Sequence, residues 1–185
     1  FVDFLAGLSI GLADREIDLI IHTAPPGELL AHYQRFASSG SVDGMIVSAP
    51  ELDDDRVTTL RDRGFPFVVH GRTEGEVDYA YYDIDNDAAL ASATTLLADL
   101  GHRRMALMNG PAGLAFVAQR ETAFRRVLGE RQINVPERFI SHDEMSEEQG
   151  FARAASLLGG REGPAPTAFI CSSTLQALGV IRAAT

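Results

Sequence analysis

The sequence predicts an α/β fold whose sheets are mainly parallel. Short apolar runs alternate along the chain with longer segments whose apolar residues recur at the spacing of a helix. The short runs are nearly continuous in apolar side chains, which is typical of strands buried on both faces. A polar or flexible cluster follows each run. This alternation is typical of parallel sheets covered by helices.

The same pattern predicts the elements in order. Phe4, Leu8 and Leu12 recur at helical spacing, so the chain opens in a helix. Residues 17–22, IDLIIH, form a nearly continuous apolar run and predict a buried strand. Glycines follow several helical segments, where glycine commonly ends a helix. We expect helices at residues 1–12, 28–38, 53–63, 87–100, 115–131, 146–158 and 175–184. We expect strands at residues 17–22, 44–48, 67–70, 79–84, 105–108, 138–140 and 168–171.

Charge is spread unevenly along the chain. All 16 basic residues are arginine, which excludes lysine-based Schiff-base chemistry and a phosphate-loop lysine. The net charge is −10, with −12 over residues 1–100 and +2 over residues 101–185. Such an acidic chain repels nucleic acid and anionic membranes. DNA binding would therefore need a basic element outside it.

Composition and motifs exclude several classes of site. One cysteine, Cys171, excludes an internal disulfide and a cysteine-based zinc site, and it fits a reducing compartment. No apolar run reaches the ~18–20 residues that a membrane span needs. The motifs GxGxxG, GxSxG and HExxH are absent, and the histidines show no paired metal spacing. We expect no catalytic residue, no metal and no cofactor, and we expect that the chain is not an enzyme.

Polar clusters after the strands are candidates for a ligand site, because open α/β sheets bind ligands beyond the carboxyl ends of their strands. They lie at residues 22–23, 48, 70–72, 83–86, 109–110 and 172–173. Each cluster has a simpler interpretation as well, since loops are polar in any protein. Asp83, Asp85 and Asp87 alternate and so share one face of a strand, which favours a solvated strand end and helix N-terminus over a magnesium site.

Arg120 interrupts an apolar helical stripe. The stripe is formed by Phe116, Ala123, Phe124 and Val127. At ~100° per residue, Arg120 falls inside it. An arginine on a buried face must be paired or must face a polar cleft. Its planar fork suits two hydrogen bonds to a carboxylate or to neighbouring hydroxyls, so Arg120 is the leading candidate for ligand binding.

Six motifs extend this interpretation over the whole chain: SVDGMIVS, PFVVHGR, YDIDND, LGHRRMALMNGP, QRETAFRRVL and PTAFICSSTLQALGVIRA. Together they resemble the effector-binding core of the LacI/GalR family of bacterial sugar-responsive repressors, which is similar to periplasmic sugar-binding proteins. The resemblance implies two doubly wound parallel-sheet lobes of the type I periplasmic-binding-protein architecture. The lobes would be residues 1–100 and 101–185, with a sugar between them.

The resemblance also implies segments beyond both ends of this chain. A helix-turn-helix headpiece and a hinge helix are expected upstream of Phe1, and further strands are expected beyond Thr185. We expect a homodimer in the cytoplasm that contacts operator DNA through the headpiece and makes no contact with a membrane. Its effector is expected to be a small molecule, a carbohydrate.

Ligand contacts follow from the resemblance residue by residue. The matching positions are Arg120, Asn86, Ser173, Phe1 and Met145; Arg72, at a strand end, completes the predicted set. Phe1 corresponds to an aromatic at the cleft edge, and Met145 stands where relatives place a stacking aromatic. Met145 departs from the family pattern, as does Thr174, which stands where the family very often has aspartate.

Five of the six predicted contacts, all except Met145, also have an alternative role. Phe1 packs in the first turn of a helix, and Asn86 and Ser173 cap the helices that follow them. Arg72 pairs with one of the nearby acids. Arg120 pairs with a carboxylate of the facing lobe.

Three classes of function are compatible with these residues. The leading hypothesis is the effector domain of a transcriptional regulator, in which a bound sugar shifts the equilibrium between states of different operator affinity. The alternatives are a sugar-binding protein of a transport system and an enzyme on the same fold. The sequence upstream of Phe1 separates the first two, because a transport protein would carry a signal peptide there.

Overall fold

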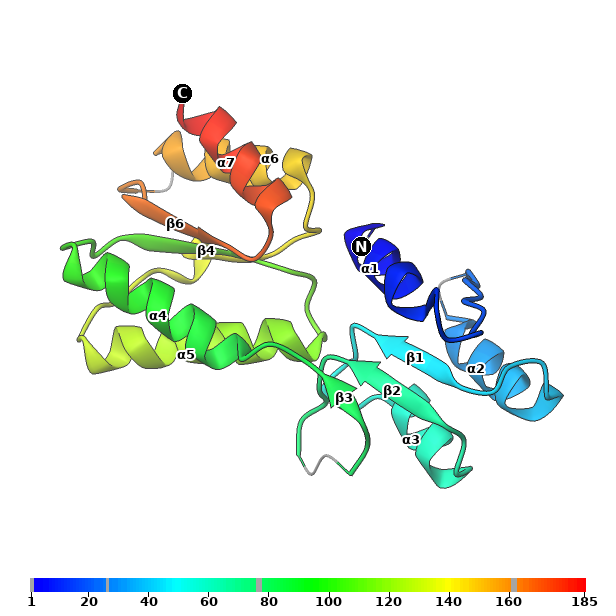
Figure 1. Ribbon diagram of the computed structural model, residues 1–185. Helices are drawn as coiled ribbons and strands as arrows, with labels where there is room; N and C mark the ends of the chain where they lie inside the picture. Colours follow the sequence, from blue (N-terminus) through cyan, green and yellow to red (C-terminus); the bar gives the residue numbers. More distant parts are fainter. Residues whose placement is uncertain (1, 26, 76–77, 161–162) are drawn as a thin grey trace. The chain divides into compact units, whose positions relative to one another are not determined.

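The computed structural model describes residues 2–25, 27–75, 78–160 and 163–185 (Figure 1). The chain forms two compact units, Phe1–Ser41 and Val42–Thr185. The predicted α/β class with parallel sheets is confirmed. In the described residues, no helix is long and apolar enough to cross a membrane.

The first unit contains two helices and the segment that connects them. α1 spans Val2–Leu12 and α2 spans Leu29–Ser39. Gly40 ends α2 in the left-handed conformation, with a φ of 66° that glycine adopts without strain. Phe1, with its predicted place in the first turn and at the cleft edge, lies outside the described residues.

The predicted strand at residues 17–22 is wrong. These residues form no strand, and Ile17, Ile20 and Ile21 have exposed fractions of 54%, 62% and 59%. A strand is stable when a neighbouring strand satisfies its backbone hydrogen bonds, and no described segment pairs with this one. An apolar run without a partner strand therefore stays outside the sheets of the described residues.

The second unit begins with a three-stranded parallel sheet in the order β1-β2-β3. Its strands are β1 (Met45–Ser48), β2 (Phe67–His70) and β3 (Tyr81–Tyr82), and α3 (Asp55–Asp62) lies between β1 and β2 in the sequence. Val47 and Val69 pair in register and are fully buried. The nearly continuous apolar runs therefore predicted β1 and β2 correctly.

β3 is shorter than the strand predicted at residues 79–84. Only Tyr81 and Tyr82 pair with β2, and both side chains are exposed. The carboxylate of Asp83 accepts a hydrogen bond of 2.8 Å from the backbone N–H of Ile84. A side chain that captures the local backbone in this way competes with sheet pairing, which explains why the strand ends before Asp83.

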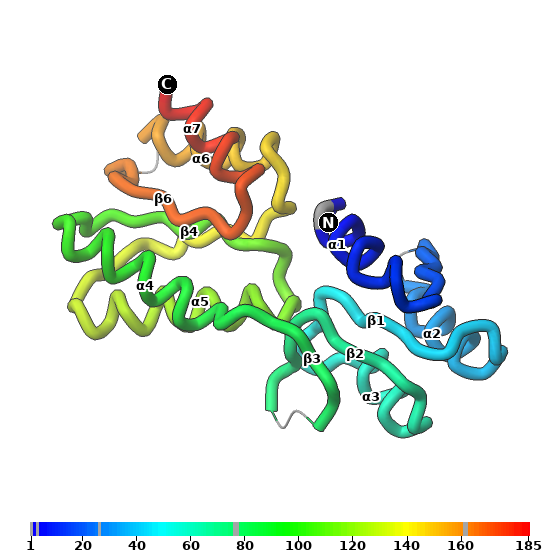
Figure 2. Tube along the Cα trace, in the orientation of Figure 1, coloured from blue at the N-terminus to red at the C-terminus, as the bar shows by residue number. Residues whose placement is uncertain are grey.

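A second parallel sheet, in the order β5-β4-β6, forms the rest of the unit. Its strands are β4 (Met105–Asn109), β5 (Ile140–His142) and β6 (Ala168–Cys171), and its helices are α4 (Asn86–Asp99), α5 (Ala115–Glu130), α6 (Glu147–Leu158) and α7 (Thr174–Ala184). Figures 1 and 2 show α4 and α5 on one face of this sheet and α6 and α7 on the other. β4 is the central strand, and all its residues are buried.

The strand predicted at residues 138–140 begins later. Glu137–Phe139 form a short 3₁₀ helix, η1, and β5 starts at Ile140. The N–H of Phe139 donates to the carbonyl of Pro136 at 2.9 Å, so this residue closes a turn rather than joining the sheet. Its buried ring contributes to packing, and its apolar character was the reason for the wrong boundary.

The two sheets lie on either side of residue 100 in the sequence. The division into lobes at residues 1–100 and 101–185 stays a prediction.

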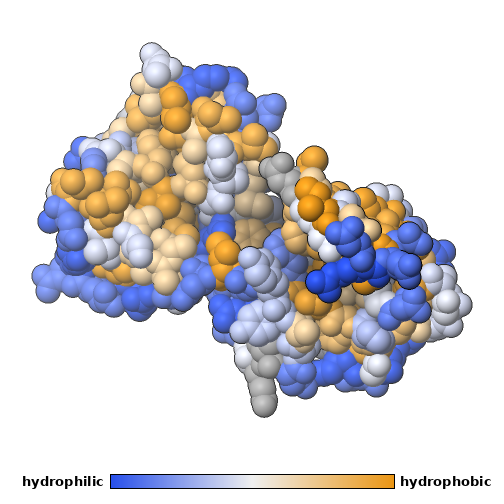
Figure 3. Space-filling view, in the orientation of Figure 1, coloured by the Kyte–Doolittle hydropathy of each residue, from blue (hydrophilic) through white to orange (hydrophobic). Residues whose placement is uncertain are grey.

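Exposed apolar side chains occur on two helices of this unit, Leu96 on α4 and Leu175, Leu178 and Ile181 on α7. Hydrophobic surface is visible over both helices in Figure 3. Exposed apolar surface of this kind often marks a place of association.

Candidate ligand-binding site

Arg120 lies on α5, where Ala123, Phe124 and Val127 are buried as the stripe predicted. Its Nε donates a hydrogen bond of 2.8 Å to Oδ1 of Asn86, and its Nη1 donates one of 3.2 Å to the carbonyl of Ser172. Its guanidinium carbon lies 4.8 Å from the centre of the Phe116 ring. Within the described part of the chain, the hydrogen bonds of Arg120 reach uncharged oxygens and no carboxylate. The alternative prediction, in which Arg120 pairs directly with a carboxylate, is therefore wrong among the described residues.

Burial lowers the pKa of Arg120 from its usual value, and the negative charge of Asp83 opposes that shift. A guanidinium remains charged at any working pH because its pKa is so high. Arg120 therefore places a positive charge in a half-buried position without a directly bonded acid.

Asn86 is the first residue of α4 and is 1% exposed. Its Nδ2 donates to Oδ1 of Asp83 at 3.2 Å and to the carbonyl of Ile84 at 3.3 Å. The alternative role of Asn86 as the helix cap is wrong. Asp85 is the cap, and its side chain accepts the backbone N–H of Ala88 at 2.9 Å. The amide of Asn86 is thereby left to bind Arg120.

Asp83 joins Arg72 to this group. Nε of Arg72 donates to Oδ2 of Asp83 at 3.1 Å, and the hydrogen bond raises the pKa of Arg72. The guanidinium carbon of Arg72 lies 5.5 Å from the centre of the Tyr81 ring. The alternative interpretation of Arg72, pairing with a nearby acid, is what the structure shows; a ligand contact by Arg72 stays a prediction.

The interpretation of Asp83 as part of a solvated strand end is wrong. Its side chain is only 10% exposed. The other part of the interpretation, a helix N-terminus, is confirmed, because Asp85 caps α4 and Asp87 lies in the first turn of that helix. Asp87 forms an ion pair of 2.5 Å with Arg126. Residue spacing placed the three carboxylates on one face, but the chain leaves the strand after Tyr82 and each carboxylate turns to a different partner.

Asn109 and Gln176 form a buried polar floor next to Arg120. Oδ1 of Asn109 accepts from Oγ of Ser172 at 2.9 Å, and Nδ2 donates to the carbonyl of Val117 at 2.9 Å. Nε2 of Gln176 donates to the carbonyl of Asn109 at 2.9 Å. The carbonyl of Ser172 accepts a hydrogen bond from Arg120, so Ser172 connects Asn109 with the arginine.

Gln176 was missed by sequence reasoning. It is 1% exposed and lies on the same face of α7 as the buried Gly179 and Val180. The signal was available, because a polar residue three and four positions before buried ones occupies their helical face, as Arg120 does on α5.

Ser173 and Met145 meet at the same edge of the sheet. Oγ of Ser173 accepts the backbone N–H of Gln176 at 3.2 Å, so its alternative role as the cap of α7 is confirmed. A Cβ added at Gly110 would lie 3.3 Å from the sulfur of Met145 and 3.4 Å from Cζ of Phe116. Met145 and the ring over which Arg120 lies are therefore both close to Gly110. Ligand contacts by Ser173 and Met145 stay predictions.

Other polar clusters predicted at strand ends form local pairs that do not include Arg120. Oγ of Ser48 lies 3.1 Å from Nδ1 of His70, at the ends of β1 and β2. His22 belongs to the first unit, where its Nε2 lies 2.5 Å from Nδ1 of His32. In the described residues, no group of three or more His, Cys, Asp or Glu side chains is placed to hold a metal ion.

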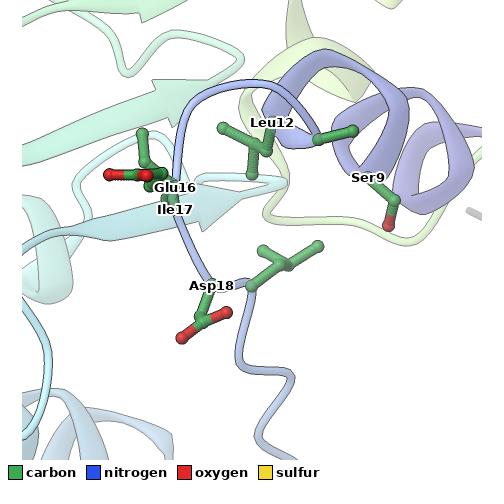
Figure 4. A pocket seen from close by; sticks show the side chains of 7 residues that line it. Ser9, Leu12, Glu16, Ile17 and Asp18 are labelled. Carbon is green, nitrogen blue, oxygen red and sulfur yellow. The ribbon is translucent and has the colours of Figure 1, made fainter.

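A separate hollow of about 410 Å³ lies in the first unit, at the end of α1 and the connection that follows it (Figure 4). Its lining residues are Ser9, Leu12, Ala13, Glu16, Ile17, Asp18 and Leu19. Figure 4 shows the carboxylates of Glu16 and Asp18 pointing in different directions. The hollow contains none of the predicted ligand contacts.

Known proteins are similar to this chain in sequence and in fold. Residues 94–185 match the family described as periplasmic binding protein-like domain. The chain is 38% identical over 184 residues to the HTH-type transcriptional regulator AglR of Rhizobium meliloti (strain 1021), a match that covers 99% of this chain and 51% of AglR. Among solved structures, the putative transcriptional regulator LacI from Bacillus cereus subsp. cytotoxis NVH 391-98 matches with a TM-score of 0.91 and 25% identity, over 99% of this chain and 65% of that one.

The chain belongs to the LacI/GalR family. A further solved LacI/GalR-type structure is described as a transcriptional regulator CelR–cellobiose complex. It is similar to this chain with a TM-score of 0.82 and 26% identity, over 98% of this chain and 56% of that one. This LacI/GalR chain spans about half the length of the curated relatives it matches.

Proposed function

We propose that this chain is the effector-binding part of a DNA-binding transcriptional regulator and that its effector is a carbohydrate. The observation that carries the proposal is the guanidinium of Arg120 at the carboxyl edge of the β5-β4-β6 sheet, held by Asn86 and the carbonyl of Ser172. A guanidinium has five N–H donors, and Nη2 of Arg120 makes no hydrogen bond to a described residue. Neighbouring sugar hydroxyls offer paired oxygen acceptors that suit such a fork.

Two further observations support a carbohydrate. The CelR–cellobiose complex, similar to this chain over most of its length, is a regulator with a bound disaccharide. Arg120 reaches the carboxyl edge of the sheet through the carbonyl of Ser172, whose hydroxyl donates to Asn109, and its guanidinium lies over the ring of Phe116. Ser173 and Met145 lie at the same edge. This mixture of a few placed polar groups and apolar walls is typical of small-molecule sites.

Regulation would follow from differential binding. A carbohydrate that binds one state of the regulator better than the other shifts the equilibrium toward that state, and operator affinity changes with it. The named relatives are transcriptional regulators, and none of them favours the alternative of a transport protein or an enzyme.

We propose operator DNA and a second copy of the chain as partners. The net charge of −10 disfavours DNA contact by residues 1–185, so a headpiece outside them would make that contact. A two-fold dimer would match a palindromic operator. α1 and α2, with the exposed apolar face of α7, offer surface for such pairing. A regulator of this kind would act in the cytoplasm, where the DNA is.

The test is a titration of the complete regulator with cellobiose and a panel of other mono- and disaccharides, followed by calorimetry and by operator binding in a mobility-shift assay. We expect at least one carbohydrate to bind and to change operator affinity. The proposed function would be contradicted if calorimetry detected no binding of any carbohydrate in the panel and none of them changed the affinity for operator.

A further inference from the structure

Four side chains form a continuous hydrogen-bonded chain in the second unit, here named the Asp83 relay: Arg72, Asp83, Asn86 and Arg120. The relay begins where Nε of Arg72 donates to Asp83 at 3.1 Å. It continues from Nδ2 of Asn86 to Asp83 at 3.2 Å and ends from Nε of Arg120 to Oδ1 of Asn86 at 2.8 Å. It connects Arg72, two residues after the end of β2, with Arg120 on α5.

The relay determines which way the amide of Asn86 points. Arg120 can only donate, so the amide oxygen must face it. The carboxylate of Asp83 can only accept, so the amide nitrogen must face Asp83. The two demands agree, and both act on a side chain that is 1% exposed. A turn of the amide by half a rotation would break both hydrogen bonds inside the protein.

The amide of Asn86 then has no donor left for a ligand. Its nitrogen carries two N–H groups, and these bind Oδ1 of Asp83 and the carbonyl of Ile84. Its oxygen holds Arg120 and retains one acceptor site. The hydrogen bonds of the Asn86 side chain therefore serve mainly to hold the guanidinium of Arg120.

Asp83 is itself held firmly. One carboxylate oxygen accepts from the N–H of Ile84 and from Asn86, and the other accepts from Arg72. The side chain is 10% exposed, so water competes little for these bonds. Asp83 is also the acid whose charge acts on the half-buried guanidinium of Arg120.

We propose that Asp83 is a positioning residue for Arg120: it orients the amide of Asn86, and that amide holds Nε of Arg120 so that the remaining guanidinium N–H groups serve the effector. The inference rests on the proposed function and deepens it. It assigns to Asp83 a part in effector affinity without contact with the effector.

Asp83→Asn tests the inference because it keeps the shape and removes the charge. A single amide oxygen must then serve Arg72, Ile84 and Asn86, and an amide N–H opposes one of these donors. Asp87→Asn is the matched control: it makes the same chemical change on α4, in an exposed ion pair with Arg126 outside the relay. Arg72→Met removes the other partner of Asp83 and serves as the second variant if Asp83→Asn folds poorly.

The first measurement needs no ligand. The solvent exchange rate of the Arg120 Nε–H is followed by ¹H–¹⁵N NMR on the complete regulator, with the signal assigned by its loss in Arg120→Met. We expect exchange in Asp83→Asn to be faster by about tenfold, because a hydrogen bond that holds this group is loosened. Arg72→Met should act in the same direction, and Asp87→Asn should match the parent.

The second measurement is the affinity for cellobiose, or for whichever carbohydrate of the panel binds the parent. Faster exchange together with an affinity about tenfold weaker supports the proposal. Weaker affinity with unchanged exchange would show that Asp83 contacts the effector itself, and unchanged affinity would show that the relay has no part in binding; either result overturns the proposal. If no carbohydrate binds the parent, the proposed function fails, and the exchange rate still shows whether Asp83 positions Arg120.

Discussion

The Nε of Arg120 donates a hydrogen bond of 2.8 Å to Oδ1 of Asn86. This bond connects the middle of α5 with the first residue of α4, two helices that pack on the same face of the β5-β4-β6 sheet (Figure 1). Since Asn86 is almost fully buried, the bond holds Nε of the guanidinium in place. The proposed ligand would bind the guanidinium N–H groups that have no partner among the described residues. The predictions that follow begin with this contact.

Arg120→Met should weaken carbohydrate binding by about 10- to 100-fold, because hydrogen bonds to a charged group contribute about 1.5–3 kcal/mol. Methionine suits the apolar stripe of α5, so the variant should fold. Its free energy of unfolding should fall by about 1–2 kcal/mol, since Asn86 and the carbonyl of Ser172 each lose a donor. Calorimetry and thermal unfolding measure the two effects.

Arg120→Lys is the companion variant. An ammonium keeps the charge but not the planar fork, so we expect a smaller loss of affinity than with methionine. Parent-like affinity in both variants would show that Arg120 supports the fold alone.

Met145→Trp should raise carbohydrate affinity by about 2- to 10-fold, the range expected when an aromatic face is added to an apolar contact. The reason is the place of Met145, whose sulfur lies close to Gly110, as does the ring of Phe116 over which Arg120 lies. Calorimetry with several sugars is the measurement. Parent and variant with the same affinity for every sugar that binds would place Met145 outside the ligand site.

Gly179→Ala should destabilise the second unit. A Cβ at this position would lie 2.2 Å from the carbonyl oxygen of Glu147 and 2.5 Å from the backbone nitrogen of Phe151, so α6 and α7 would have to move apart. Overpacking of this kind costs about 1–3 kcal/mol. Urea unfolding followed by circular dichroism measures the loss.

Gly129→Ala is the control for that experiment. Gly129 lies in α5 with no atom within 4 Å of an added Cβ. Alanine there should raise the free energy of unfolding by roughly 0.5–1 kcal/mol, because glycine is costly inside a helix. Equal effects at Gly129 and Gly179 would show that the close approach of α6 and α7 does not limit stability.

Glu121 should make stability depend on pH in the acid range. Burial raises its pKa, but hydrogen bonds from Arg125 at 2.7 Å and His142 at 2.6 Å outweigh burial, so the pKa lies below its usual value of 4.5. A carboxylate with a lowered folded-state pKa stabilises the protein above its unfolded-state pKa, and this contribution is lost as the pH falls through the lower value.

Unfolding of the parent and of Glu121→Gln at pH 7 and at pH 3 tests this point. The variant should be less stable by roughly 1 kcal/mol at pH 7, and the difference should shrink at pH 3. Glu130→Gln removes a more exposed ion pair of the same helix and should cost less than about 0.5 kcal/mol at pH 7. A difference between parent and Glu121→Gln that is larger at pH 3 than at pH 7 would contradict the assignment.

Local pattern was enough for most elements of the second unit. β1, β2, β4 and β6 are strands within one residue of their predicted bounds, because each is an apolar run whose residues are buried or partly buried and whose neighbours run parallel. The same pattern failed at residues 17–22 and overestimated β3. Hydropathy records the tendency of side chains to leave water, whereas a strand also requires a second strand at its side.

In the candidate site, too, local pattern identified one feature and tertiary contacts determined the rest. The sequence by itself singled out Arg120, because a charge inside an apolar helical stripe is visible in the order of residues. Only the tertiary structure decided what holds it: Asn86 on another helix, with its amide oriented by Asp83, and the carbonyl of Ser172 after β6. Helical periodicity tells which face of its own element a residue occupies. The choice of hydrogen-bond partner depends on donors and acceptors that folding brings together from distant parts of the chain, and no local pattern encodes that choice.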